Sequence, residues 1–347
     1  MICRRPLLYM RILCFAFVTS IFTSTATAQE FFKGKVIRIV LGTPPGGGFD
    51  VYSRAISRHI GKHIPGNPTI TIEYMPGAGM MIAANYLYNI AKPDGLTIGN
   101  WIGLLVLQQV LGTKGIEFDA RKFEWIGTAK ADSPVCALTK ESGITSVDSW
   151  LAAKTPVKIG GIAPGASTSD IPRVLKAVLN LPVQLVEGYK GTADIRLAAD
   201  AREVAGGCWP WETMKVNWSQ QLASGDVKVV IQAVAKKHAE LLGVPNALDL
   251  AKTDEARQLI KAGIIDPAVI TQPYSLPPGT PKDRVKLLQD AFVATMKDPD
   301  FLSEAKKSNL EINPIYAREL ENIVRDFFTL SPALVGKLKE LLVPKDS

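Results

Sequence analysis

A buried strand that runs directly into a glycine-rich turn and an amphipathic helix is the feature that most constrains the fold of this chain. Residues 36–41 read VIRIVL, and such a run of β-branched and aliphatic residues is typical of a strand covered on both faces of a parallel sheet. The turn TPPGGGFD at residues 43–50 follows at once, and apolar residues then recur at helical spacing from Val51 to Ile60. This order of elements predicts an α/β fold.

The same kind of unit recurs along the 347 residues, a length that suggests two domains. Helices are expected at 80–91 and 171–179, and further strands at 69–74, 96–102, 135–139, 157–162, 183–186, 203–208 and 227–235. The strand at 227–235 is expected to return the chain to the first domain. The last third is predicted to be mostly helical, with Thr280 as the N-cap of a helix that has Pro281 at its first position.

The N-terminus has the pattern of a secretory signal. Arg4, Arg5 and Arg11 precede a short apolar run, and Ala26-Thr27-Ala28 provides the small residues of a cleavage site. The run at 12–22 is too short for a membrane span, so residues 1–28 are predicted to be a cleaved signal peptide. A twin-arginine signal is the less favoured alternative. We therefore expect the mature protein in the periplasm.

Charge and composition exclude several classes of protein. Three of the 40 Lys and Arg residues lie within 1–28, so the remaining 37 face 33 Asp and Glu and leave a net charge of +4. No basic block remains, which argues against a nucleic-acid partner. Hydrophobic residues make up 47% of the chain, which excludes a disordered chain.

Cleavage would also remove Cys3 and Cys14 and leave Cys136 and Cys208 in an oxidising compartment. A disulfide and a pair of buried free thiols are both compatible with the sequence, because spacing along the chain does not fix the geometry.

Two loops are candidates for ligand binding. In the first, at 43–50, three glycines allow a close backbone approach and the following helix N-terminus favours an anion, although a tight turn that binds nothing is equally compatible. It is neither a Walker loop, since Phe49-Asp50 follows Gly48, nor a dinucleotide fingerprint, since Val51 replaces the last glycine.

The second loop, APGASTSD at 163–170, lies at the same point of the second domain, and its hydroxyl groups could cap the helix or bind a ligand oxygen. The two loops are expected to face each other across a cleft.

The residues give little support for catalysis. His59 and His63 lie four apart on one predicted helix without the glutamate of a zinc-protease motif, and Ser167 is not in a nucleophile elbow. No metal, cofactor or catalytic residue is therefore expected. Tyr189 and Trp209 follow strands of the second domain, and we expect them near the cleft.

Motifs in a fixed order resemble a known family. They are VIRIV at 36–40, PPGGG-x-D at 44–50, E-x-x-PGAG at 73–79, PDG-x-T at 93–97, YKG at 189–191 and PPGTP at 277–281. This set resembles the Bug family, the extracytoplasmic solute receptors of tripartite tricarboxylate transporters. The resemblance implies a periplasmic-binding-protein fold of type II, with two α/β domains, crossing strands and a small carboxylate bound between the domains. On this basis the predicted parts are the signal peptide at 1–28, domain 1 at 29–131 and 235–347, and domain 2 at 132–234.

The resemblance also implies which residues bind the ligand. They are Thr43, Gly46, Gly47, Gly48 and Asp50 of the first loop, Gly165, Ala166, Ser167, Thr168, Ser169 and Asp170 of the second, and Tyr189. Trp209 is added as a candidate because of its position after a strand of the second domain. The chain departs from the family pattern at Thr43, usually an aromatic residue, at Tyr74-Met75, usually Asn-Arg, and in the second loop, where Asp170 adds a negative charge.

The predicted function is a monomeric receptor that delivers a small organic acid to membrane transport subunits. An exported hydrolase or lyase with the same cleft, and a partner protein that presents its ligand to a sensor, are the alternatives.

Overall fold

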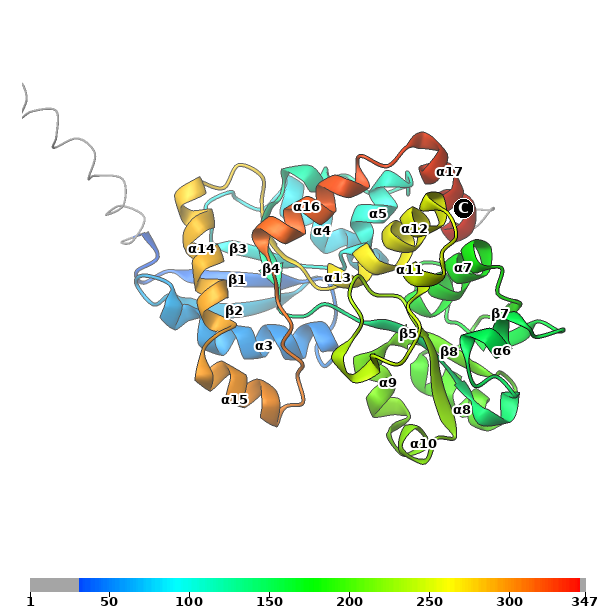
Figure 1. Cartoon of the computed structure of the whole chain (residues 1–347). Coiled ribbons are helices and arrows are strands. Elements are labelled where there is room, and N and C mark those ends of the chain that lie inside the picture. Colours follow the sequence, from blue (N-terminus) through cyan, green and yellow to red (C-terminus); the bar gives the residue numbers. More distant parts are fainter. Residues whose placement is uncertain (1–30, 344–347) are drawn as a thin grey trace, which may run out of the picture.

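The computed structural model describes residues 31–343, so the predicted signal peptide lies outside the described residues. Two lobes, each built on its own β-sheet, lie side by side (Figure 1). The chain has the mixed α/β character that the strand and helix patterns predict.

The first lobe contains a six-stranded sheet in the order β11-β4-β10-β3-β1-β2. Its strands are β1 (Val36–Leu41), β2 (Thr69–Tyr74), β3 (Thr97–Asn100), β4 (Glu124–Thr128), β10 (Tyr274–Leu276) and β11 (Ile315–Tyr316). Strands β2 and β3 pair with β1 in parallel, whereas β10 runs antiparallel between β3 and β4. The carboxyl ends of β1, β2 and β3 therefore meet at one edge.

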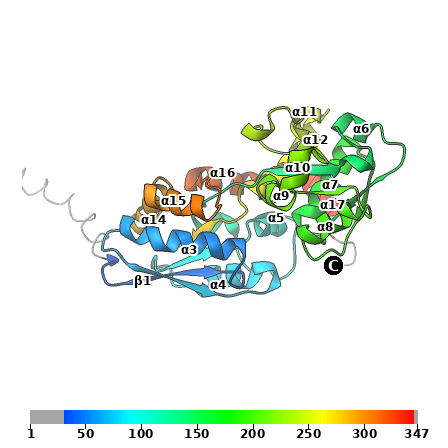
Figure 2. The same cartoon turned by 90° about the horizontal axis from the view of Figure 1, so that it is seen from below.

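Helices cover both faces of this sheet (Figure 2). One face packs against α3 (Gly48–Ile60), α14 (Lys282–Thr295) and α15 (Pro299–Lys307), and the other against α4 (Met81–Asn89), α5 (Leu104–Val110) and α16 (Ala317–Phe327). Alternate residues of β1, namely Ile37, Ile39 and Leu41, enter the core beneath α3, as the two-residue period of a strand requires.

The second lobe contains a five-stranded sheet in the order β7-β6-β8-β5-β9. Its strands are β5 (Pro134–Thr139), β6 (Val157–Gly160), β7 (Val183–Val186), β8 (Gly206–Pro210) and β9 (Val227–Gln232). Its helices are α6 (Val147–Leu151), α7 (Ser167–Leu179), α8 (Thr192–Asp200), α9 (Trp211–Asn217) and α10 (Ser219–Ser224). Strand β6 pairs in parallel with β7 and β8, and β5 runs antiparallel to β8 and β9.

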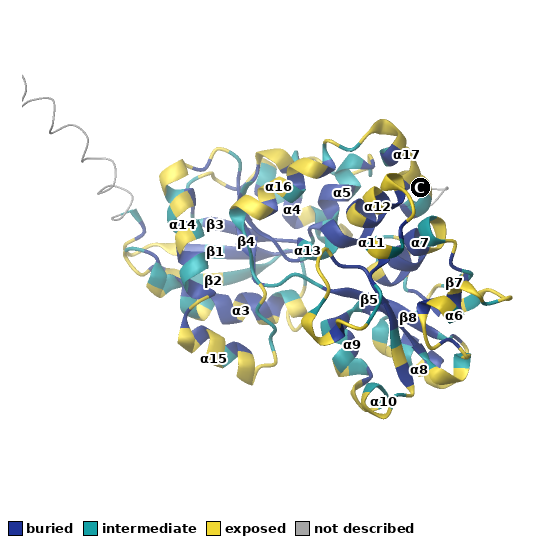
Figure 3. Cartoon of the chain, viewed as in Figure 1, coloured by how far each residue is buried: buried dark blue, intermediate teal, exposed yellow. Residues whose placement is uncertain are grey.

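A layer of helices joins the lobes. It consists of α11 (Ala247–Leu250), α12 (Asp254–Ile260), a π-helical turn (Lys261–Ile265), α13 (Asp266–Val269) and α17 (Pro332–Leu342). One buried apolar cluster runs from α4 and α5 through this layer to α7. Buried residues, coloured dark blue, are visible in α5, α7, α11 and α12 (Figure 3). Strands β10 and β11 thus lie in the first sheet, whereas α12 and α17 pack against α7. The domain boundaries at 131 and 234 remain a prediction. No described helix combines the length and hydropathy that crossing a membrane requires.

Several predicted element ends differ from those in the structure, and three of them have a clear local reason. Helix α14 begins at Lys282, and the hydroxyl of Thr280 donates to the carbonyl of Pro277 rather than capping the helix. Strand β8 begins at Gly206 rather than 203, because a turn with Arg202 at φ 66° precedes it. Helix α4 begins after Met80, which has the left-handed φ of 73°.

Cys136 and Cys208 form a disulfide, which decides between the two alternatives that the sequence left open. The two residues are directly opposite each other in the antiparallel pair of β5 and β8, and both are fully buried. The bond closes a separation of 72 residues inside the second lobe.

Replacing both cysteines by alanine should lower the free energy of unfolding by about 2–4 kcal/mol, because the bond restricts the unfolded chain. Urea unfolding of residues 29–347, followed by circular dichroism, measures the change. Reductant should lower the midpoint of the natural chain and leave that of the double variant unchanged. Equal midpoints for the oxidised and reduced natural chain would contradict the prediction.

Candidate functional site

The two predicted loops lie where the fold concentrates free backbone donors. The first loop (42–50) connects the carboxyl end of β1 to α3, and the second loop (161–170) connects the carboxyl end of β6 to α7. Both helices are 13 residues long, and no side chain caps either N-terminus. Among the hydrogen bonds of the described residues, none uses the N–H groups of Gly47, Gly48, Ser167 or Thr168. Such groups at a helix N-terminus favour an anion.

Asp50 fixes the shape of the first loop. Its Oδ2 accepts from the N–H of Gly46 at 2.8 Å, and its Oδ1 accepts from Arg54 Nε at 2.8 Å and from the Tyr74 hydroxyl at 2.6 Å. Burial alone would raise the pKa of this carboxyl, but these hydrogen bonds outweigh it and hold the pKa below its usual range. Asp50 is thus an ionised residue with both oxygens occupied, which positions the glycines rather than presenting a charge to a ligand.

Asp170 has the corresponding place in the second loop but a different environment. Its Oδ1 accepts from the N–H of Gly165 at 3.1 Å, and the nearest guanidinium nitrogen of Arg173 lies 3.6 Å from the same oxygen. Only 5% of Asp170 is exposed, and this burial raises its pKa to about 7; the Gly165 hydrogen bond and Arg173 oppose the rise, while Glu187 adds to it.

The hydroxyl side chains of the two loops have different roles. Thr168 is buried and accepts from the N–H of Ile162, so it holds the second loop together. The hydroxyl oxygens of Thr43 and Ser169 are buried without a hydrogen-bond partner among the described residues. Ser167 is exposed at the first position of α7.

A cavity of about 340 Å³ lies between the lobes. Its lining includes Ile102 and Leu104 after β3, Gly165, Ala166, Ser167, Asp170 and Ile171 of the second loop and α7, Pro210 at the end of β8, Gly263 and Ile264 of the π-helical turn, and Thr271 before β10. The strand-end residues all lie at the carboxyl edges of the parallel strands, where open α/β sheets bind ligands. The structure therefore brings the second loop to the cavity.

The first loop lies close to this cavity but does not line it. A Cβ atom on Gly48 would lie 3.6 Å from the side-chain amide nitrogen of Gln272, the residue that follows the lining residue Thr271. No described hydrogen bond joins the first loop to the second. That the two loops bind one ligand together remains a prediction.

Trp209 lies in the core and not at the cleft. It is fully buried and stacks on Trp218 with ring centroids 5.0 Å apart. Successive side chains of a strand point to opposite faces, so Pro210 lines the cavity while Trp209 points away from it. Tyr189 is half-buried against the same apolar cluster and does not line the cavity.

Sequence reasoning missed Asp132 and the π-helical turn. Asp132 lines the cavity and pairs with Lys130, whose Nζ lies 2.6 Å from its Oδ1. Gly263 permits close packing of the turn on α7, because a Cβ there would lie 3.1 Å from Val174. The glycine within a predominantly helical stretch of sequence was the one signal that could have indicated this turn. π-Helical turns frequently mark functional sites.

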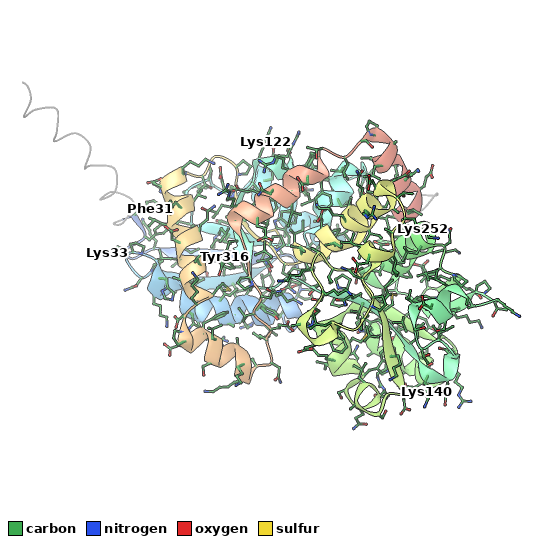
Figure 4. All side chains as sticks on the ribbon, in the orientation of Figure 1. Phe31, Lys33, Lys122, Lys140, Lys252 and Tyr316 are labelled. Carbon is green, nitrogen blue, oxygen red and sulfur yellow. A yellow bond between two sulfur atoms is a disulfide. The ribbon has the colours of Figure 1, made fainter. Side chains whose placement is uncertain are left out.

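Basic groups are not part of the cavity wall. Its described lining contains no Lys, Arg or His, and Lys122, Lys140 and Lys252 lie at the outer edges of the lobes (Figure 4). His59 and His63 pair with Glu304 and Asp298, on the outside of the first lobe.

One described cluster has donor atoms within 4.8 Å of one another, namely Glu212, His238 and Glu311. The Nδ1 atom of His238 accepts from the N–H of Glu240, so in the neutral ring the proton lies on Nε2, which suits donation to the carboxylates rather than metal ligation. Glu212 Oε2 accepts from the N–H of Ser133. No hydrogen bond of the described residues joins the three side chains, and His238 Nε2 lies 3.9 Å from Glu311 Oε1.

Two α/β lobes with a cavity between their sheet edges define the fold of the periplasmic solute-binding proteins. No protein-family model matches the sequence, and no curated protein matches it.

Solved structures do match. A TctC solute-binding protein from Polaromonas superimposes with a TM-score of 0.71 at 16% identity, over 88% of this chain and 97% of that chain. The periplasmic binding protein BugD gives 0.60 at 20% identity, over 88% and 97%. MatC from Rhodopseudomonas palustris with bound malate gives 0.58 at 17% identity, over 89% and 99%. The expected fold is thus confirmed. Two of these neighbours are named as binding proteins, and the third contains bound malate.

Burial of Asp170 should make stability depend on pH. The folded carboxyl, with a pKa of about 7, binds a proton between about pH 4 and 7, where the unfolded carboxyl is already ionised. Stability should therefore fall as the pH rises through this window, by at most about 4 kcal/mol.

The variant Asp170→Asn keeps an acceptor for Gly165 and removes the titration. Urea unfolding of both proteins from pH 4 to 8 isolates the effect, because other titrations cancel in the difference. The natural chain should lose stability relative to the variant as the pH rises. If the free energy of unfolding of the natural chain stayed constant relative to that of the variant, or increased relative to it as the pH rises, Asp170 would have no raised pKa.

Proposed function

We propose that this protein is a periplasmic solute-binding protein that captures a small organic carboxylate between its lobes for a tripartite tricarboxylate transporter. The observation that carries the proposal is the pair of uncapped helix N-termini, those of α3 and α7, at the sheet edges beside the interlobe cavity. Free N–H groups and helix dipoles there supply donors for carboxylate oxygens. The malate bound to the structural neighbour MatC supports this ligand class.

Binding would close the lobes, because a ligand that contacts both lobes favours the state in which both contacts form. The passage between β4 and β5 at residues 129–133 and the passage from β9 to β10 connect the two sheets. An affinity in the micromolar range corresponds to about −8 kcal/mol, which several backbone hydrogen bonds in an enclosed site can supply.

The proposal includes no catalysis. A hydrolase would need a nucleophile and a base in the cavity, and the described lining offers Ser167 without any histidine. The three histidines of the chain contact Glu304, Asp298 and the backbone of Glu240 instead. The proposal also includes export to the periplasm, a monomeric state and docking to membrane subunits, which the signal pattern and the family resemblance support.

A thermal-shift screen tests the function. Residues 29–347 are unfolded in guanidinium and refolded to remove carried-over ligand, then titrated with malate, citrate, adipate, benzoate and glutamate. A ligand at 100 times its Kd should add about 2.7 kcal/mol and raise the Tm by several degrees. A saturable shift with no turnover of the acid, checked by chromatography, is expected. Absence of any shift would contradict the proposal, and turnover would favour the enzyme.

The variant Gly48→Val tests whether the first loop contributes. A Cβ atom at Gly48 would make only an ordinary contact, at 3.6 Å, with the side-chain amide of Gln272, so we expect folding to be little affected. The valine would block the approach of a ligand to the N-terminus of α3. We expect at least a tenfold loss of affinity for the best acid of the panel, or about 1.4 kcal/mol, by calorimetry. Gly243→Val, at another exposed glycine with open space, is the matched control and should bind normally. Equal affinities for the two variants would remove the first loop from the site.

A further inference from the structure

The two lobes use the same device to hold their loops. In each, an aspartate in the first turn of the helix accepts a hydrogen bond from the N–H of a loop glycine: Gly46 to Asp50 at 2.8 Å, and Gly165 to Asp170 at 3.1 Å. The two carboxyl groups thus have the same role in their loops. A difference in their other contacts therefore shows which hydrogen-bonding groups each lobe leaves available to a ligand.

The two carboxyl groups differ in their hydrogen bonds: both oxygens of Asp50 accept one, whereas only one oxygen of Asp170 does. Both oxygens of Asp50 accept hydrogen bonds, from Gly46, Arg54 and Tyr74. Asp170 uses only Oδ1; its Oδ2 has no hydrogen-bond partner among the described residues, although the residue is 95% buried. Arg173 does not fill this place, because its nearest contact, at 3.6 Å, is with Oδ1, and its Nη2 donates to Glu187.

The composition of the cavity wall around Asp170 indicates which ligand group could bind the unpaired Oδ2. The described lining contains two charged side chains, Asp132 and Asp170. Lys130 pairs with Asp132 in a nearly buried salt bridge. Asp170 is therefore the one acidic group of the described lining without a lysine partner, and in its ionised form it presents a negative charge to the cavity. Aliphatic side chains surround it, namely Ile102, Leu104, Ile171 and Ile264. The one basic side chain near this carboxyl, Arg173, is shared with Glu187 and does not line the cavity. A simple dianion would therefore meet the ionised carboxyl without a basic side chain in the cavity wall.

We propose that the cavity selects a small aliphatic amino acid, whose ammonium group donates to Asp170 Oδ2 while its carboxylate binds the free N–H groups of the loops. This inference rests on the proposed function and narrows its ligand class. An ammonium group supplies the donor that Asp170 lacks and neutralises its charge, and the aliphatic walls accommodate the side chain.

Calorimetric titration with two matched pairs of acids tests the inference. Leucine is compared with 4-methylpentanoate, and glutamate with glutarate, since the second member of each pair lacks only the ammonium group. The natural chain should bind leucine at least tenfold more tightly than 4-methylpentanoate, and the preference should fall at least fivefold in Asp170→Asn. Asp194→Asn is the matched control, because Asp194 also accepts a loop N–H, that of Lys190, but does not line the cavity. It should keep the preference.

The outcomes separate the two proposals. Equal or tighter binding of the acids without an ammonium group to the natural chain would overturn the amino-acid inference and leave the carboxylate receptor standing. Loss of the preference in both variants would also overturn it, since the effect would not be specific to the cavity. Failure of all four acids and of the wider acid panel would overturn both proposals. The comparison within the natural chain does not depend on the folding of any variant.

Discussion

The backbone N–H groups at the starts of α3 and α7 are the constraint on which the rest of the site depends. A helix leaves its first N–H groups without internal acceptors, and most helices satisfy them with a capping side chain. Here Asp50 and Asp170 lie where they could serve the helix, yet each accepts instead from a glycine of the preceding loop. The loops are held in shape and the helix donors stay free. Because the strands before both loops belong to parallel ladders, these donors come to the sheet edges that border the space between the lobes.

The helical layer between the lobes packs against both of them and supplies part of the cavity wall. Helices α12 and α17 pack on α7, and the same apolar cluster continues to α5 in the first lobe. The π-helical turn after α12 supplies Ile264 to the cavity wall, and Gly263 allows this turn to approach Val174 closely. One wall of the cavity thus comes from a segment that belongs to neither sheet, so its shape depends on packing between distant parts of the chain.

Electrostatic differences between the lobes give the cavity its chemical character. In the first lobe, Arg54 and Tyr74 satisfy the loop aspartate, and its pKa lies below the usual range. In the second lobe, burial dominates, and Asp170 titrates near neutrality. Both loops have a glycine whose N–H is bound by an aspartate in the first turn of the next helix, and the difference in pKa arises from what the surrounding elements place beside each carboxyl.

The sequence alone determined the repeated strand-turn-helix units, the two loops and their likeness to solute receptors, because hydrophobic period and glycine position act over short stretches of chain. It left open the pairing of Cys136 with Cys208, which depends on the register between β5 and β8. It placed Trp209 at the cleft, but the alternation of the strand turns this side chain into the core and Pro210 toward the cavity. Asp132 and Ile264 carry no local motif at all. Only the tertiary structure decided these features, since the direction of a side chain and the neighbours of a charge are set by elements far away in the sequence.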